Sequence, residues 1–225
     1  MTDILERLIG YAAPGKGAQA AAKRLMQTQG SLGPILESAP EDLRKTPGVS
    51  AAAARLLSLV PQLARYEAGE DAKAMTVLDT FEKAGAYLKS LYIGAHNECF
   101  YLLSLDEQGR FLDCALVQQG TVDEAPFYLR RILERSARAR ARAVVLSHNH
   151  PSGTLEPSPQ DVQCTKAAIE ALVPLGILVL DHILIAGGVP VSLRDSGGIA
   201  EVLFTRQAQN HPLIQNWLND REEEC

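Results

Sequence analysis

Cysteine is scarce in this sequence of 225 residues, and its four cysteines are scattered along the chain. They form no C-x-x-C pair, and their density is far below that of a small domain held together by disulfides. A disulfide scaffold is therefore excluded, and we expect free thiols that are mostly buried. The four positions are Cys99, Cys114, Cys164 and Cys225.

An excess of basic charge is also missing. The chain has 27 acidic and 22 basic residues and a formal net charge of −5, so no overall field draws it to nucleic acid or to an anionic membrane. Any such binding must be local. Apolar residues make up 46% of the sequence, which at this length is enough for one good core and a smaller second unit.

Long apolar runs are absent as well. The most apolar stretch, ALVPLGILVL at 171–180, is interrupted by Pro174 and Gly176 and is far shorter than the ~20 residues that span a membrane. We expect it to be an interior strand. The segment MTDILERLIGYAAPG contains Asp3 and Glu6 and has neither a basic leader nor a long apolar core, so it does not look like a secretion signal. These features predict a cytoplasmic protein without a membrane partner.

Residues 1–70 are rich in alanine and in short helical periods separated by turn signals, which predicts a small helical domain. Within it, apolar residues on both sides of Pro47-Gly48 have the outline of a helix-hairpin-helix, whose turn amides can bind a phosphate. Ser50 stands where the usual second glycine of such a turn would be. DNA contact at this turn and a plain helical packing unit both stay open. The apolar residues are Leu43, Val49, Ala53, Leu56 and Leu57.

A second domain is expected at 71–199, after a polar stretch at 66–74 that serves as a linker. It is predicted to begin with a helix whose N-cap is Thr76. Two β-rich runs around a polar connector then predict a hairpin, and helices and strands alternate after it, so the predicted class is α/β (α+β). The elements are strands at 98–105 and 111–119, a helix at 125–139, a strand at 142–150, a helix at 158–173, and strands at 177–188 and 189–193.

A tail at 200–225 follows this domain. Its segment HPLIQNWLNDREEEC is predicted to form a short helix with apolar residues on one side and a frayed acidic end. The tail could cover either the functional site or a partner surface, and both interpretations stay open. The apolar residues are Leu213, Ile214, Trp217 and Leu218.

The stretch LSHNHPSGTLEPSPQDV is the segment where we expect chemistry. Side chains alternate along a strand, so His148 and His150 project to the same face. Ser158 and Pro159 are a strong helix start, and Asp161 falls in the first turn, where the helix dipole favours an acid. Two nitrogens and one carboxylate can thus converge, as in a catalytic zinc site that keeps a fourth position for water. Spacing alone leaves a second interpretation open, with structural histidines and an ordinary helix cap.

This stretch reads H-x-H, seven residues, S, two residues, D, which resembles the signature of the JAMM or MPN-plus metallopeptidases. The blocks GTVDEAPFYLRRILERSARARARAVVLSHNHPSG, PSPQD and VLDHILIAGG closely resemble the bacterial RadC family, which joins a helix-hairpin-helix unit to such a domain. The resemblance covers 4–196 and is strongest at 94–194. It implies a JAMM/MPN (cytidine-deaminase-like) domain at 71–199, with a mixed sheet and flanking helices.

The resemblance also implies functional residues. In that family two histidines and the aspartate hold zinc, and the matching positions are His148, His150 and Asp161. An upstream glutamate, matched by Glu98, takes a proton from water and returns it to the leaving nitrogen. A serine, matched by Ser158, donates a hydrogen bond to the oxygen that develops negative charge. The implied function is zinc-dependent hydrolysis of a peptide or isopeptide bond in a peptide or protein substrate. A solvated strand-end carboxylate is the alternative for Glu98.

Two other functions stay open. The helix-hairpin-helix outline, together with the family's association with DNA repair, favours a protein that binds or processes DNA through residues 1–70. A binding module whose metal site is retained but idle is the third interpretation. The sequence makes no prediction about the oligomeric state.

Two further features have alternative interpretations. His182 follows Asp181 in an apolar strand and is expected to be a satisfied core histidine rather than a ligand, with support of a ligand as the alternative. Arginines recur at i, i+4, i+7 and i+11 and form a basic stripe if the helix at 125–139 persists. A solvated face is the expected role of the stripe, and contact with a phosphate backbone is the alternative. The arginines are Arg131, Arg135, Arg138 and Arg142.

Overall fold

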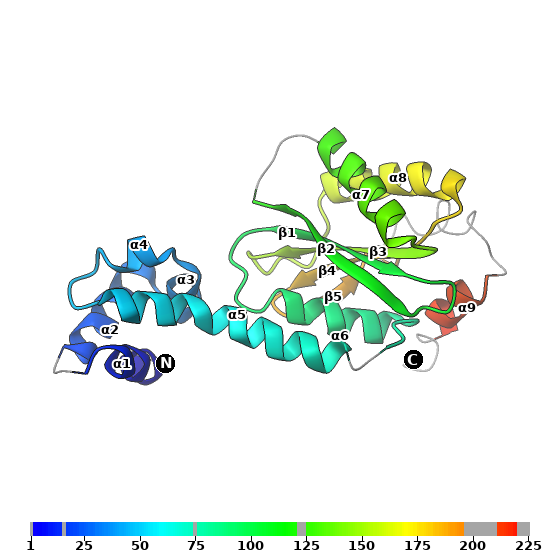
Figure 1. Ribbon diagram of the computed structural model, residues 1–225. Coiled ribbons are helices and arrows are strands. Elements are labelled where there is room, and N and C mark those ends of the chain that lie inside the picture. The colour runs from blue at the N-terminus through cyan, green and yellow to red at the C-terminus, as the bar shows by residue number, and fades with distance from the viewer. Residues whose placement is uncertain (1, 15–16, 74–75, 121–124, 196–210, 220–225) are drawn as a thin grey trace. The chain divides into compact units, whose positions relative to one another are not determined.

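The computed structural model describes residues 2–14, 17–73, 76–120, 125–195 and 211–219. Figure 1 shows the helices and strands of the chain. None of the helices in the described ranges is both long and apolar enough to cross a membrane. The chain divides into two compact units, Met1–Ala68 with Ile93–His96, and Gly69–Tyr92 with Asn97–Cys225.

The first unit is helical and has its own apolar core. Small alanine side chains alternate with leucine and isoleucine in this core, which lets short helices pack closely. The helices are α1 (Thr2–Ala12), α2 (Ala18–Gln29), α3 (Leu32–Glu37), α4 (Pro40–Leu43) and α5 (Ala51–Lys73). The core residues are Leu5, Ile9, Ala21, Ala22, Leu25, Ile35, Leu43, Val49, Ala53, Ala54 and Leu57.

The turn between α4 and α5 contains the Pro47-Gly48 pair. Gly48 has a φ of +94°, a backbone conformation that favours glycine. The Ser50 hydroxyl accepts a hydrogen bond from the Ala53 N–H at 3.0 Å. The residue in place of the second hairpin glycine therefore caps the start of α5.

The polar stretch expected as a linker is helical as far as Lys73, where α5 ends. Its alanine, glutamate and lysine residues have good helix propensity, so a polar composition does not interrupt the helix.

The next helix begins later than predicted. α6 spans Phe81–Leu91, and its N-cap is Thr80, whose hydroxyl accepts from the Lys83 N–H. The predicted cap, Thr76, instead accepts a hydrogen bond through its carbonyl oxygen from the Phe111 N–H at 3.1 Å. The hydrogen bond with Phe111 keeps Thr76 outside the helix, and Thr80 caps the helix instead.

A five-stranded mixed sheet forms the centre of the second unit, with the order β2-β1-β3-β4-β5. β1 and β2 form the predicted antiparallel hairpin, β3 is antiparallel to β1 and parallel to β4, and β5 is antiparallel to β4. The parallel pair needs a crossover connection, which a helix provides. The strands are β1 (Cys99–Leu105), β2 (Phe111–Gln119), β3 (Ala143–His150), β4 (Leu178–Ala186) and β5 (Val189–Ser192).

Helices cover both faces of this sheet (Figure 1). α7 (Ala125–Ala139) and α8 (Pro159–Leu172) pack on one face, over a buried cluster that includes Leu102, Leu146 and Ile169. α6 contacts β4 and β5 on the other face, and α9 contacts β4 there. The predicted fold class, N-terminal helices followed by a mixed sheet with flanking helices, is confirmed.

The apolar stretch 171–180 is not a continuous strand, so that prediction was wrong. It contains the end of α8, the 3-10 turn η1 (Val173–Leu175) and the first residues of β4. Gly176 has a φ of +71°, and its N–H donates to the Val173 carbonyl oxygen at 2.9 Å. A turn that needs positive φ therefore separates helix from strand, and apolar composition alone did not distinguish the two.

The described part of the tail forms the short helix α9 at Pro212–Asn219. Leu213, Ile214 and Trp217 are buried, as the pattern predicts. The helix packs on the sheet face opposite α7 and α8. The rest of the predicted tail helix, with its acidic end and Cys225, lies outside the described residues.

The three cysteines in the described part of the chain are thiols that take part in no disulfide there, as predicted. Cys99 is buried, and Cys114 and Cys164 are half-buried.

Candidate metal centre

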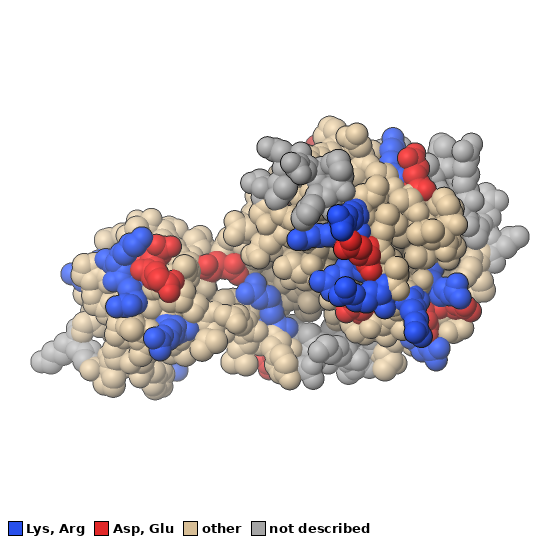
Figure 2. Space-filling view, turned by 45° about the horizontal axis from the view of Figure 1, so that its top comes forward, with Lys and Arg blue, Asp and Glu red and all other residues tan. Residues whose placement is uncertain are grey.

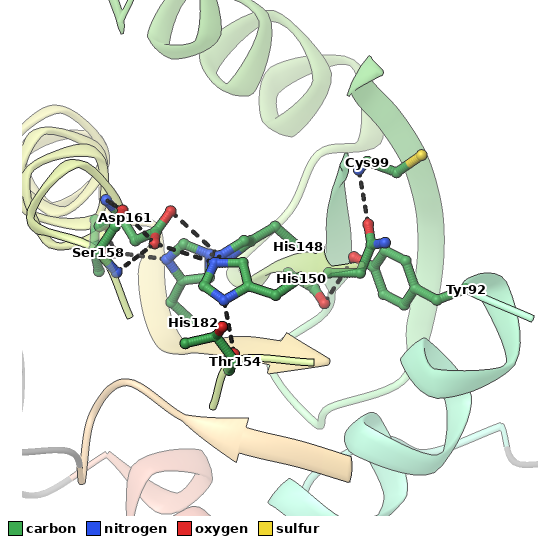
Figure 3. Close-up of polar contacts among 11 residues, drawn as sticks. Tyr92, Cys99, His148, His150, Thr154, Ser158, Asp161 and His182 are labelled. Atoms are coloured by element: carbon green, nitrogen blue, oxygen red, sulfur yellow. Dashed lines mark hydrogen bonds and ion pairs between the residues drawn. The ribbon is translucent and has the colours of Figure 1, made fainter. Parts of the chain in front are cut away.

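Three side chains from β3 and from the start of α8 point toward one another (Figure 3). His148 and His150 project from the same face of β3, and their Nε2 atoms lie 3.1 Å apart. Asp161 places its Oδ1 atom 3.2 Å from His148 Nε2 and its Oδ2 atom 3.5 Å from His150 Nε2. The fold therefore brings together the three side chains that the sequence pattern singles out as candidate metal ligands.

The spacing of these donor atoms suits a zinc ion. Ligand atoms at the usual zinc distances in a tetrahedral arrangement lie about 3.3–3.6 Å from one another. His148 Nε2 lies 3.1 Å from His150 Nε2 and 3.2 Å from Asp161 Oδ1, close to that range, and the three residues offer one ligand atom each, all within 4.8 Å of one another. Two imidazole nitrogens and a carboxylate oxygen are ordinary zinc ligands, so the residues fit the ion.

The Nδ1 atoms of His148 and His150 form polar contacts on the side of each ring that faces away from the candidate metal position. His150 Nδ1 lies 2.8 Å from the Thr154 carbonyl oxygen. A carbonyl can only accept, so Nδ1 carries the proton, and Nε2 of the neutral ring keeps a lone pair. His148 Nδ1 lies 2.8 Å from His182 Nε2. Such contacts behind a ligand orient its ring toward the metal.

Ser158 and Asp161 form a capping box at the start of α8. The Ser158 hydroxyl accepts from the Asp161 N–H at 3.2 Å and donates to Asp161 Oδ2 at 2.6 Å, and the Ser158 N–H donates to the same oxygen at 2.7 Å. These bonds fix the carboxylate in orientation. The two hydrogen bonds to Oδ2 come from Ser158, and Oδ1 faces His148.

The Asp161 carboxyl is held in its ionised form. Burial by itself raises its pKa, but the hydrogen bond and charge that His148 supplies when its ring is protonated, together with the two bonds from Ser158, outweigh burial and lower the pKa below the usual value. A metal ligand must be deprotonated. Asp161 is therefore in the required state at neutral pH.

Glu98 immediately precedes β1, which begins at Cys99, one residue later than predicted. Phe100 pairs with His148 across β1 and β3, and the two rings stack with centroids 6.4 Å apart. The pairing of β1 with β3 ends at Phe100 and His148, two residues after Glu98, and the Cys99 N–H donates to the Asn149 side-chain oxygen at 2.7 Å. The Glu98 side chain is exposed. Glu98 therefore lies next in the chain to a strand that pairs with β3, and its place beside the three candidate ligands stays a prediction.

Tyr128 of α7 lies on the same side of the sheet. Its ring packs against the Phe100 ring at a centroid distance of 5.9 Å. Burial raises the pKa of the Tyr128 hydroxyl, and the charges of Cys164, Glu98 and Asp161 raise it further. The two carboxylates therefore belong to the electrostatic surroundings of Tyr128.

His182 is not one of the three convergent ligands. It is completely buried, and its ring nitrogens contact His148 Nδ1 at 2.8 Å and the Thr165 hydroxyl at 2.6 Å. Burial, then the neighbouring His148, lowers the pKa of His182 well below the ordinary value. His182 is therefore a satisfied core histidine, as expected, and it contacts the ring of His148 on the side opposite the candidate ligand atom.

Sequence reasoning did not single out Thr165. It lies one helical turn after Asp161, so the two side chains share a face of α8. The i, i+4 spacing from Asp161 was the only sign in the sequence that Thr165 lies near the candidate site. Its contact with His182 depends on the position of β4, which the spacing does not predict.

The arginine stripe lies on α7, away from the three ligands, and it is shorter than predicted. α7 ends at Ala139, so Arg142 is not on the helix, and this arginine pairs instead with Glu107 at 3.5 Å. Figure 2 shows basic side chains gathered with acidic ones among them on the face that carries α7. A surface hollow of about 220 Å³ there is lined by Leu116, Arg131, Glu134, Arg135 and Arg138.

The mixed sheet and the His-His-Asp group at the junction of β3 and α8 define a JAB-type domain with a candidate metal site. A family model described as the RadC-like JAB domain matches residues 78–198, more than half of the chain. The protein belongs to the RadC family.

Similar proteins cover most of this chain. A UPF0758 protein of Stenotrophomonas maltophilia (strain R551-3) is 34% identical over 196 residues, which are 87% of this chain and 84% of the relative. A UPF0758 protein of Alcanivorax borkumensis (strain ATCC 700651 / DSM 11573 / NCIMB 13689 / SK2) is 36% identical over 178 residues, 79% of this chain and 80% of the relative. A third, from Aliivibrio fischeri (strain MJ11), is 35% identical over 185 residues, with 82% and 83% covered.

Proposed function

We propose that this protein is a zinc-dependent hydrolase that cleaves peptide or isopeptide bonds. The observation that carries the proposal is the convergence of His148, His150 and Asp161, which offer one ligand atom each, all within 4.8 Å of one another. When bound by three protein ligands, zinc lowers the pKa of a coordinated water toward neutrality and polarises a carbonyl group. The remaining roles belong to side chains at the edge of the site.

Glu98 is the proposed general base and general acid. It directly precedes β1, whose Phe100 pairs with His148, and its exposed side chain is open to water. A carboxylate in this place can take a proton from the attacking water and deliver it to the leaving nitrogen. Without that delivery an amine is a poor leaving group, so the same residue serves both halves of the reaction.

Ser158 is the proposed donor to the oxygen that develops negative charge. Its hydroxyl has one proton and two lone pairs. One lone pair caps α8 through the Asp161 N–H, and the proton lies toward Asp161 Oδ2. Rotation about the C–O bond turns that proton toward the reacting oxygen, and the Ser158 N–H remains on Oδ2 to keep the carboxylate in place. The cap and the donor role are therefore compatible.

Detection of released amines tests the hydrolase proposal on a mixture of proteins, so no single substrate has to be chosen in advance. Zinc-loaded protein is incubated with native bacterial extract in which existing amines have been blocked, and newly formed α-amino and ε-amino groups are labelled and identified by mass spectrometry. We expect new amines with the wild type and a loss of at least about 100-fold with Glu98→Gln, in line with a lost proton-transfer group. The matched control is Glu107→Gln, in the turn that follows β1, which should retain the wild-type pattern.

The outcomes separate the competing interpretations. If Glu98→Gln keeps zinc and loses the new amines, the hydrolase assignment is supported. If the variant releases the same amines as the wild type, Glu98 is not the base. If the zinc-loaded wild type releases none, the proposal is contradicted, and a binding module with an idle metal site is the better description.

DNA binding is the second candidate function. The observations that favour it are the three arginines around one hollow on α7 and the Gly48 turn of the helical unit. A gel shift with duplex and branched DNA at about 50 and about 200 mM salt tests it. Phosphate contacts predict binding that weakens steeply as salt rises and that falls in the Arg135→Gln/Arg138→Gln variant. No shift at the lower salt concentration would exclude this function.

A further inference from the structure

His182 and Thr165 are joined to the candidate centre by a continuous line of hydrogen bonds. Thr165 Oγ1 lies 2.6 Å from the Asp161 carbonyl oxygen and 2.6 Å from His182 Nδ1. His182 Nε2 lies 2.8 Å from His148 Nδ1. Thr165 and His182 are fully buried, so water does not compete for these contacts. Figure 3 shows His182 behind the two ligand histidines.

The donor and the acceptor in every hydrogen bond of this line follow from the first bond, which joins Thr165 to the Asp161 carbonyl oxygen. The Asp161 carbonyl oxygen has no hydrogen, so the short contact with Thr165 uses the single hydroxyl proton of the threonine. Thr165 Oγ1 must then accept from His182 Nδ1–H. A neutral imidazole has one N–H, so His182 Nε2 carries a lone pair.

The last bond of the line sets the state of the metal ligand. Because His182 Nε2 accepts, His148 Nδ1 must donate to it. The proton of the neutral His148 ring is then on Nδ1, and its Nε2 lone pair faces His150 and Asp161. If the donors and acceptors were reversed, the proton of the neutral His148 ring would be on Nε2, where it would prevent the binding of a metal ion.

We propose that Thr165 and His182 are positioning residues that hold His148 in the Nδ1–H form, so that its Nε2 lone pair is presented to the metal ion. The inference rests on the proposed function only for the presence of that ion. Asp161 of α8 then has two roles. Its side chain supplies a ligand, and its carbonyl oxygen determines which groups donate in the line of hydrogen bonds. His150 reaches the same form independently, through the Thr154 carbonyl oxygen.

Two pairs of variants separate the hydrogen bonds from the packing. Thr165→Val has the shape of threonine without the hydroxyl, and Thr165→Ser restores the hydroxyl. His182→Leu removes the acceptor for His148 Nδ1–H, and His182→Gln offers an amide oxygen close to the place of Nε2. The serine and glutamine variants are the conservative partners that a positioning role predicts will be rescued.

The first measurement is the protonation pattern of the His148 ring in the metal-free protein, from long-range proton–nitrogen NMR correlations. We expect Nδ1–H in the wild type, Thr165→Ser and His182→Gln, and a mixture with Nε2–H in Thr165→Val and His182→Leu. The second measurement is the zinc dissociation constant by chelator competition. We expect it to rise about 10–100-fold in the valine and leucine variants and to stay within about threefold of wild type in the serine and glutamine variants.

Each outcome decides one question. A purely structural role for Thr165 would lower the melting temperature of Thr165→Val and leave the His148 pattern and the zinc affinity unchanged, which would overturn the inference. So would Nε2–H in the metal-free wild type. If the wild type binds no zinc, the proposed function fails, while the NMR comparison still tests the hydrogen-bond line.

Discussion

The indole nitrogen of Trp217 donates to Oδ2 of Asp181 across 3.3 Å. The same carboxylate oxygen accepts from the Ser192 hydroxyl at 2.7 Å, and Oδ1 accepts from the His182 N–H at 2.7 Å. Asp181 and His182 are neighbours in β4, so their side chains point to opposite faces of the sheet. Asp181 binds α9 through Trp217, and His182 contacts His148 of the candidate metal centre.

Trp217→Phe should therefore destabilise the second unit without weakening metal binding. The change keeps an aromatic ring and removes a hydrogen bond to a buried charged group, so we expect the free energy of unfolding to fall by about 1.5–3 kcal/mol. Trp217→Ala should cost about 3–5 kcal/mol, because it also leaves a cavity. Urea denaturation followed by circular dichroism measures both. Equal stability of wild type and Trp217→Phe would show that the bond to Asp181 contributes nothing.

The helical unit offers a separate test at Ser50, whose hydroxyl caps α5. Ser50→Ala should lower the stability of that unit by about 1 kcal/mol, whereas Ser50→Gly should cost only a few tenths. Hydrogen exchange at the first amides of α5 is the direct measurement, because it reports opening of this helix alone. Faster exchange in the glycine variant than in the alanine variant would contradict the capping role.

The thiols of Cys114 and Cys164 should react slowly while the protein is folded. Burial raises the pKa of Cys114 to about 12, and burial with the charge of Asp161 raises that of Cys164 to about 11. Only the thiolate is alkylated, so at about pH 8 both sites should react at least about 100-fold more slowly than in urea-unfolded protein. The rate should rise about tenfold per pH unit. Peptide mapping after iodoacetamide treatment measures each site, and equal folded and unfolded rates would contradict the burial.

Local signals predicted much of the candidate site. The alternation of His148 and His150 in a strand and the cap at Ser158 are properties of neighbouring residues, and each needs only a strand or a helix start to be correct. Asp161 follows from the same helix start. The convergence of these groups depends on one short loop, which is why spacing was informative.

Long-range pairing accounts for what the sequence did not predict. Thr76 and Thr80 are both acceptable caps, and the choice is made by a hydrogen bond from Phe111, more than thirty residues away. The role of His182 depends on Thr165 and on His148, which are 17 and 34 residues distant in the chain. No local periodicity carries that information, because it arises only when β4 pairs with β3 under α8.

The most direct test of the central claim is the zinc content of the purified protein after loading and dialysis, measured by mass spectrometry of the metal. We expect one zinc per chain in the wild type and in the controls His96→Ala and His211→Ala, which remove histidines outside the candidate centre. We expect loss of that zinc in His148→Ala/His150→Ala and in Asp161→Asn, with the fold retained by circular dichroism. Stoichiometric zinc in the folded double variant would contradict the ligand assignment.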